Sequence, residues 1–106
     1  MIAPGIEISL EALTERAAKL LKVELVPPRA LIGKSTVDAV RSGVFYGLAG
    51  AVDRIVGGVR EELGPETEAI ATGGLAHVLA PFTETIDHVD DLLTLTGLRI
   101  VHERNL

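Results

Sequence analysis

Apolar residues recur at helical spacing near the start of the chain, after a turn signal at Pro4-Gly5. The pattern predicts a helix from about Ser9 to Lys22, with the charged residues mostly off the apolar stripe. Ser9 stands in N-cap position, and Glu11 lies in the first turn, where a carboxylate favours the helix dipole. The stripe consists of Leu10, Leu13, Ala17, Leu20 and Leu21.

The longest predicted helix occupies the middle of the chain. Before it, the apolar run Val23–Val26 is stopped by Pro27-Pro28, which confines the run to a loop or a sheet edge. Gly33–Thr36 then introduces the helix, which should reach about Glu62 and end at Gly64-Pro65.

Glycines are unusually frequent in this long helix. Gly43, Gly47, Gly50 and Gly57 fall near one face, with larger aliphatic residues on the other side. Each interior glycine costs about 0.5–1 kcal/mol relative to alanine, so we expect another helix or sheet to approach this face closely. Simple tolerance of the glycines is the alternative, because tertiary packing often overrides propensity. A fold of 106 residues can hardly cover both sides of such a helix, which favours a partner chain.

Short strands and helices are expected to alternate in the last part of the chain. In order they are a strand over Glu68–Thr72, a short helix from Leu75 closed by Pro81, a strand over Thr85–Val89 and a final helix within Leu92–Arg104. The Thr94–Gly97 segment either interrupts or precedes the last helix. This order predicts one helix-rich α/β or α+β domain over residues 1–106.

Composition narrows the functional class. The net charge of −5 argues against general binding of nucleic acid, and the absence of cysteine removes disulfides and thiolate chemistry and suits a reducing cytosol. The first residues lack a signal-peptide pattern, and the least polar stretch, Ser42–Val52, is far short of the roughly 20 residues of a spanning helix. We therefore expect a soluble cytoplasmic protein without a membrane partner.

Gly33-Lys34-Ser35-Thr36 has the ending of a phosphate-binding P-loop. The first glycine of that motif would fall at position 28, which is Pro28. Proline lacks the amide that the phosphate cradle needs, so the P-loop interpretation fails. We favour instead an N-cap role for Ser35 or Thr36, with Lys34 in solvent.

The segment Ala71–Ala76 carries Gly73-Gly74 between a predicted strand and a predicted helix. Such a turn lets a ligand approach the backbone and meet free amides, although a tight turn without a ligand is an equal alternative. The three histidines have no metal-ligand spacing, and no carboxylate pair or nucleophile–base arrangement stands out. These residues alone thus offer one nucleotide-type turn and no catalytic set.

Four segments, taken together and in order, resemble the type III pantothenate kinase family. The chain begins with the family's I-x-P-G segment at Ile2–Gly5, and Ile32–Thr36 followed by Ser42-Gly43 and Tyr46-Gly47 is similar to its I-G-K-N-T…S-G…Y-G pattern. Ile70–Ala76 matches its I-A-T-G-G-L-A segment, and Leu93–Leu98 with Glu103–Asn105 matches its L-T-L-x-G-L…E-R-N end.

The resemblance implies one lobe of the actin-like, ribonuclease H-like ATPase architecture, in which two α/β lobes close over ATP. Kinases of this family transfer a phosphoryl group from ATP to pantothenate, the first step of coenzyme A synthesis, and act as homodimers with Mg and a monovalent cation. By this resemblance Thr36 corresponds to the threonine that contacts pantothenate from the neighbouring protomer. Gly73 and Gly74 would lie beside the adenosine end of the nucleotide.

Motifs that carry most of the family's phosphate chemistry have no counterpart in these residues, notably the Asp-x-Gly-Asn-Thr loop and the Gly-x-Asp-Arg segment with the catalytic aspartate. Phosphoryl transfer depends on positioning and on neutralising phosphate charge. We therefore expect a truncated carboxy-terminal lobe, inactive alone, that contributes a dimer interface and one side of the ATP and pantothenate cleft. We assign it no catalytic residue and no metal ligand. A stand-alone homo-oligomeric module derived from that lobe, natural or engineered, is the alternative, and a small complete enzyme is weakest.

Overall fold

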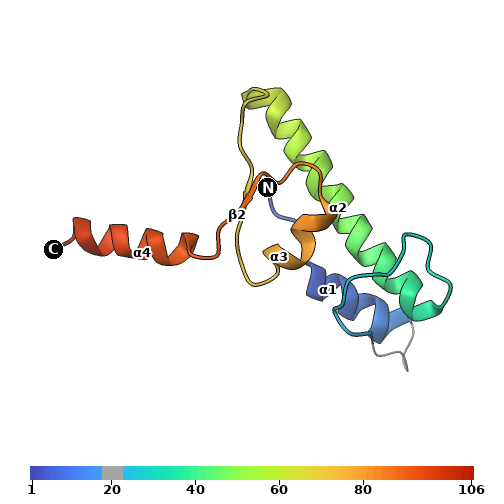
Figure 1. Ribbon diagram of the computed structural model, residues 1–106. Helices are drawn as coiled ribbons and strands as arrows, with labels where there is room; N and C mark the ends of the chain where they lie inside the picture. The colour runs from blue at the N-terminus through green and yellow to red at the C-terminus, as the bar shows by residue number, and fades with distance from the viewer. Residues whose placement is uncertain (18–22) are drawn as a thin grey trace.

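The long helix α2, Thr36–Leu63, is the element against which the others pack in the computed structural model, which describes residues 1–17 and 23–106 (Figure 1). Helix α1, Ile6–Glu11, lies beside α2 and continues into a π-helical segment, η1, over Ala12–Ala17. The core forms where α1 meets α2, and helix α3 with its following turn packs against it. Its buried members are Ile6, Leu10, Val44 and Phe45.

Helix α1 begins earlier than the sequence pattern predicted. Its N-cap is Gly5 rather than Ser9, and the Ser9 hydroxyl, inside the helix, donates to the Gly5 carbonyl at 2.8 Å. Ile6 and Leu10 are one turn apart and both buried, so packing both against α2 requires the helix to include Ile6. Tertiary burial therefore overrode the capping signal of Ser9.

The rest of the predicted first helix is only partly seen. Glu7, not Glu11, occupies the first turn, and Leu13 of the expected apolar stripe is 42% exposed. The end of that helix falls within residues 18–22, outside the described residues.

Both ends of α2 lie close to where the sequence predicted them. The Asp38 amide donates to the Ser35 side-chain oxygen at 3.1 Å, which confirms Ser35 as the N-cap, and Lys34 is exposed. At the other end Gly64 is the C-cap with φ +121°, a conformation that favours glycine. Val23–Val26 is a loop, one of the two forms expected.

The glycine face of α2 is open. Among the described residues, no atom lies within 4 Å of the position that a Cβ would take at Gly43, Gly47, Gly50 or Gly57, leaving aside the chain neighbours and the nearby backbone of the helix itself. The buried α2 residues Val44, Phe45 and Ala49 lie elsewhere on the helix. No close neighbour within the described residues thus accounts for the glycines.

Two short parallel strands follow α2. Strand β1, Ile70–Ala71, pairs with β2, His88–Val89, in the register Ile70 opposite His88 and Ala71 opposite Val89. Both lie within the predicted strands but cover only two residues each, so the described fold is helix-rich α/β with a minimal sheet.

Helical segments flank the second strand. Between the strands lie α3, Ala76–Leu79, and one 3₁₀ turn, η2, Ala80–Phe82. The α-helix ends just before Pro81, as predicted, and Pro81 itself belongs to the 3₁₀ turn. After β2, helix α4 runs unbroken over Leu93–Arg104, and the Thr94–Gly97 segment is helical rather than an interruption or a prelude.

Two charged side chains fasten α2 to the segments around the strands. Asp53 accepts hydrogen bonds from the Glu84 and Thr85 amides, each at 3.0 Å, and from the Thr85 hydroxyl at 2.6 Å. Two turns later Arg60 donates to the Thr67 and Thr85 carbonyls at 2.9 and 3.0 Å. These bonds fix the approach to β2 against the helix.

Asp87 joins this network from the approach to β2. One of its carboxylate oxygens accepts from Arg60 at 2.7 Å and from the Ala69 amide at 2.8 Å, so it links α2 with the residue before β1. The Ala69 bond holds the pKa of Asp87 below its ordinary value against opposing desolvation, and the Arg60 charge adds to the lowering.

The molecule is extended for its size. Its radius of gyration is 16.7 Å, where about 13 Å is typical of this length. Its accessible surface is 7927 Å², where about 5,700 Å² is typical of this mass. Helix α4 projects away from the rest and accounts visibly for the extended shape (Figure 1). Within residues 1–17 and 23–106, no helix has both the length and the apolar character needed to cross a bilayer.

We expect Asp53→Asn to lower the free energy of unfolding at pH 7 by about 2 kcal/mol, because an amide NH₂ would face a backbone amide and charge-assisted hydrogen bonds are lost. Partial burial raises the pKa of Asp53, but bonds from the Thr85 hydroxyl and the Glu84 and Thr85 amides outweigh it and hold the pKa below 3.8. The stabilisation is therefore complete at a pH well above 3.8, the pKa of the carboxyl in the unfolded chain. It declines as the pH falls through the lower pKa of the folded state.

Urea unfolding at pH 7 and pH 3 measures this difference. The control Glu61→Gln removes a carboxylate from an exposed position of the same helix and should change stability little. A difference between wild type and Asp53→Asn that grew towards acid would contradict the assignment.

Candidate functional site

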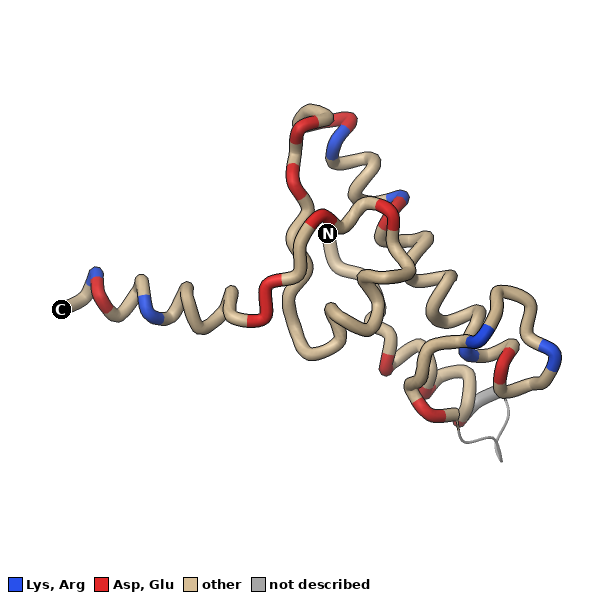
Figure 2. The backbone as a smooth tube through the Cα atoms, in the orientation of Figure 1, with Lys and Arg blue, Asp and Glu red and all other residues tan. Residues whose placement is uncertain are grey.

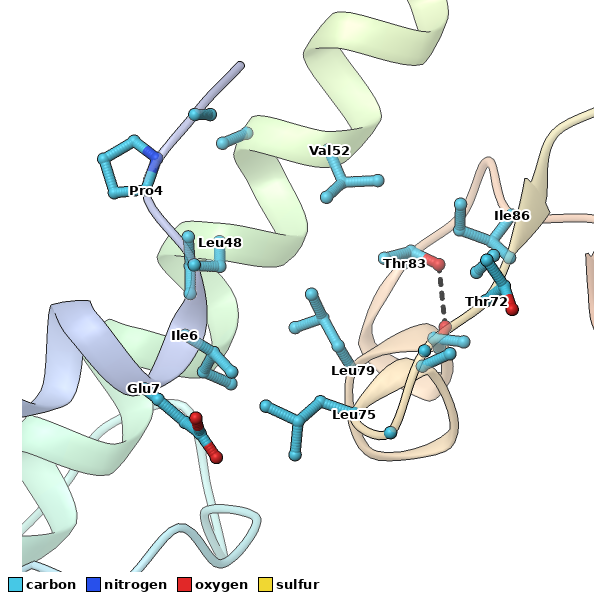
Figure 3. Close-up of a pocket in the computed structure, with 18 of the residues that line it drawn as sticks. Pro4, Ile6, Glu7, Leu48, Val52, Thr72, Leu75, Leu79, Thr83 and Ile86 are labelled. Atoms are coloured by element: carbon cyan, nitrogen blue, oxygen red, sulfur yellow. Dashed lines mark hydrogen bonds between the residues drawn. The ribbon is translucent and has the colours of Figure 1, made fainter. Parts of the chain in front are cut away.

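A cleft of about 670 Å³ lies between the amino-terminal segment, α2 and the turn that follows β1 (Figure 3). The segments around it are distant in sequence, so only the folded chain creates it. Its lining comes from residues 3–7, from one side of α2 at Leu48, Ala51, Val52 and Ile55, from residues 71–76, and from Leu79, Ala80, Thr83 and Ile86.

Aliphatic side chains form two facing walls of the cleft. Ile6 and Leu48 lie on one side and Leu75 and Leu79 on the other, with their side chains directed towards the space between them (Figure 3). Most of the remaining lining residues are small, so the backbone is close to any bound molecule. Such walls favour a flat or apolar ligand group.

Gly73 and Gly74 form the turn at one edge of the cleft. Gly73 has φ +105°, and its carbonyl accepts from the Ala76 amide at 3.2 Å. In the part of the chain that the structure describes, neither glycine amide donates to another protein group, so both remain available to a ligand. The structure thus brings the two predicted nucleotide-binding residues into one cleft with Pro4-Gly5.

The cleft carries almost no charge. Among the described lining residues Glu7 is the one that carries a charge, and none of them is a lysine or an arginine. The hydroxyls of Thr72 and Thr83 donate to the carbonyls of Asp90 and Ala80, both at 2.7 Å, and retain lone pairs for a ligand donor. These groups can orient a neutral ligand but cannot neutralise a polyphosphate.

Thr36 does not line this cleft. It is the exposed first residue of α2, beside the Ser35 cap. Gly33 packs so tightly against the first turn of α2 that a Cβ there would clash with the backbone of Asp38 and Ala39. Thr36, predicted to contact the substrate, therefore lies outside the cleft that contains Gly73 and Gly74, the residues predicted to contact the nucleotide.

Sequence reasoning missed the residues that hold the cleft in shape. Thr83 and Ile86 line it, and Asp53 fixes the segment between them through Glu84 and Thr85. One feature of the sequence could have indicated Asp53 and Arg60. They lie seven residues apart, on the same side of the predicted helix, among mostly apolar residues. Charged residues at such positions are usually paired with other polar groups.

Away from the cleft, a few titratable side chains form ion pairs at the surface. His77 lies 2.7 Å from the Asp91 carboxylate, with both side chains more than 60% exposed. Among residues 1–17 and 23–106 no group of three or more His, Asp or Glu side chains is placed to hold a metal ion.

Comparison with known proteins gives one consistent family. The family model described as type III pantothenate kinase matches residues 1–58. The type III pantothenate kinase of Frankia alni is 57% identical over all 106 residues, which make up 42% of its length. The type III pantothenate kinase of an Exiguobacterium species is 53% identical over 99% of this chain, and that of Syntrophus aciditrophicus is 52% identical over 98%. Each match covers 41% of the relative's length. The chain thus spans less than half the length of these relatives.

We expect Gly73→Ala to destabilise the chain by about 1–3 kcal/mol, because φ +105° is strained for any residue with a Cβ. Gly74→Ala is the matched control: its φ is not positive, no atom lies within 4 Å of its Cβ position, and its effect should stay below about 0.5 kcal/mol. Thermal unfolding of the two variants measures the difference. Equal melting temperatures would contradict the conformational requirement at Gly73.

Proposed function

The chain belongs to the type III pantothenate kinase family, and on that premise we propose that it forms the carboxy-terminal lobe of an ATP-dependent pantothenate kinase. In this proposal the lobe supplies one side of the ATP and pantothenate cleft and a contact between protomers. The rest of a longer polypeptide supplies the phosphate chemistry. The observation that carries the proposal is the apolar cleft at Gly73-Gly74, with its single carboxylate.

The cleft suits the adenosine end of ATP. A neutral aromatic base fits between aliphatic walls such as Leu48 and Leu75, and amides at Gly73 and Gly74 can donate to its polar atoms or to the ribose. The triphosphate carries several negative charges and needs cationic side chains, amides or metal ions. Because the described lining residues include no cationic side chain, the phosphates, Mg²⁺ and the monovalent cation would be held by the remaining polypeptide. The lobe would therefore be inactive alone.

The architecture is compatible with half of an actin-like ATPase. A long helix lies near two parallel strands, and a glycine turn leaves the first strand. A nucleotide bound at this turn would lie at the carboxyl end of a strand, where open α/β folds bind ligands. The second lobe would close over the opposite side of the nucleotide.

Thr36 is proposed to contact pantothenate in the neighbouring protomer rather than in its own. Its exposure and its absence from the lining of this cleft support that assignment. The open glycine face of α2 supports a protomer contact along the same helix, because a partner can approach glycines closely.

A full-length chimera tests the proposal. The matching segment of the Frankia alni kinase is replaced by this chain, which is 57% identical to it throughout. We expect the chimera to phosphorylate pantothenate with ATP and the 106-residue chain alone to give no turnover. A coupled assay of ADP release, with pantothenate omitted as control, measures both.

Two outcomes would contradict this function. Turnover by the isolated chain would show that the phosphate chemistry resides in these residues. A folded but inactive chimera, together with a tight oligomer of the isolated chain, would favour the stand-alone module.

We expect Gly47→Leu to weaken self-association at least about tenfold, because a large side chain on a close contact causes overpacking. No atom of the described chain approaches its Cβ position, so the variant should fold, and its helix propensity should rise. Glu62→Leu, exposed on α2 but off the glycine face, is the control. Sedimentation velocity measures the oligomer, and an unchanged oligomer of folded Gly47→Leu would contradict this interface.

A further inference from the structure

One carboxylate belongs to the lining of the cleft at Gly73-Gly74. Glu7 lies in the first turn of α1, and its side chain extends from the helix with the carboxylate directed to the side on which Leu75 lies (Figure 3). The residue is exposed, and it directly follows Ile6, which is buried in the core and forms part of one wall. A charged group is therefore placed at the edge of an apolar wall.

No described side chain pairs with this carboxylate. Within the part of the chain that the structure describes, the hydrogen bonds and ion pairs do not include the Glu7 side chain. The facing wall comes from residues 69–83, which contain no lysine, arginine, aspartate or glutamate (Figure 2). Their one histidine, His77, is paired with Asp91. In the described structure, the donors left for Glu7 are water and a molecule bound in the cleft.

This carboxylate makes the cleft selective. A ligand that covers Glu7 displaces water from it, and an ion that loses its hydration without gaining hydrogen bonds is strongly disfavoured. An ionised carboxylate accepts hydrogen bonds and donates none. The occupant that binds best therefore places donors at Glu7, whereas an anionic group placed there is repelled.

A nucleotide such as ATP has two kinds of donor, the amino group of its base and the hydroxyls of its ribose. The base suits the aliphatic walls, and the hydroxyls of Thr72 and Thr83 retain lone pairs for its amino group. Both threonines lie on the other side of the cleft from Glu7 (Figure 3). The ribose hydroxyls are thus the donors that remain for the carboxylate.

Ribose also matches a carboxylate in its geometry. The 2′ and 3′ hydroxyls are adjacent donors, and the two oxygens of one carboxylate can accept from both. Dinucleotide-binding folds use an acidic side chain for a ribose hydroxyl in the same way. Glu7 adjoins Ile6 of the wall, so the group bonded directly to a base held there, the ribose, is the part of the nucleotide that meets Glu7.

We propose that Glu7 is the ribose-recognising residue of the cleft. Its carboxylate accepts hydrogen bonds from the 2′ and 3′ hydroxyls of the bound nucleotide and selects ribonucleotides over 2′-deoxyribonucleotides. The proposal rests on the proposed function, because it takes the nucleotide as the occupant. It assigns a specificity-determining role to a residue outside the four segments that carry the family resemblance.

Titration of the 106-residue chain with nucleosides, followed by nuclear magnetic resonance of the Gly73 and Gly74 amides, tests the proposal. Nucleosides carry no phosphate, so neither metal ions nor the rest of a longer polypeptide enters the measurement. We expect adenosine to bind roughly tenfold more tightly than 2′-deoxyadenosine, because one charge-assisted hydrogen bond is lost with the 2′ hydroxyl.

Two variants weaken the acceptor in steps. Glu7→Ala should reduce the preference for adenosine to less than about twofold, and Glu7→Gln, which keeps one neutral acceptor, should give an intermediate ratio. The control Glu11→Gln removes an exposed carboxylate of the same helix that does not line the cleft, and it should keep the wild-type ratio. If Glu7→Ala fails to fold, Glu7→Gln still gives the comparison.

The ratio of the two affinities separates ribose recognition from a structural role of Glu7. A carboxylate in the first turn also stabilises the helix through its dipole, but loss of that effect would weaken the binding of both nucleosides alike. Only a direct contact with the 2′ hydroxyl changes the preference between them.

Four results would overturn the proposal. They are no shift of the Gly73 and Gly74 amides with adenosine, an unchanged ratio in Glu7→Ala, an equal change of the ratio in Glu11→Gln, and a preference for adenosine over inosine that Glu7→Ala abolishes. The last would assign the carboxylate to the amino group of the base.

The proposed function fails separately from the ribose contact. An inactive chimera, together with a 106-residue chain that distinguishes the two nucleosides through Glu7, contradicts only the kinase assignment. An active chimera in which Glu7→Ala leaves the preference for ATP over 2′-deoxyATP unchanged contradicts only the ribose contact.

Discussion

Two charged side chains on one helix, Asp53 and Arg60, hold together segments that otherwise have little to fix them. Strands β1 and β2 contribute only two residues each, too few for a stable sheet by themselves. Asp53 binds the backbone at Glu84 and Thr85, and Arg60 binds carbonyls on the approaches to both strands. The shape of the cleft depends on these bonds, because they place one of its walls against α2.

The chemistry of the cleft follows from its composition. Aliphatic walls and two glycine amides provide a place for a neutral ring and for its hydrogen-bonding atoms, while a single carboxylate provides nothing for phosphates. A kinase needs both an apolar place for the ring of the nucleotide and charged or polar groups for its phosphates. These two requirements conflict within a small site. In the proposed function the two parts are divided between this lobe and the rest of a longer polypeptide, so the apolar side can remain apolar.

Two surfaces of the described chain stay uncovered, the glycine face of α2 and the apolar side chains of α4. Interior glycines lower helix propensity wherever they lie, and exposed apolar side chains lose the stabilisation that burial would give. The open glycine face supports the proposed contact between protomers, because a partner can approach glycines closely.

The sequence by itself determined the features that depend on local chemistry. The bounds of α2 follow from the Ser35 cap and from Gly64, and the turn at Gly73-Gly74 follows from a conformation that only glycine adopts easily. Tertiary structure decided the rest. Helix α1 starts at Ile6 because burial of that residue in the core stabilises the fold. The hydrogen bonds of Asp53 and Arg60 join positions up to 32 residues apart. The cleft gathers four separate segments, and no local pattern specifies which of them meet, because that depends on how the whole core packs.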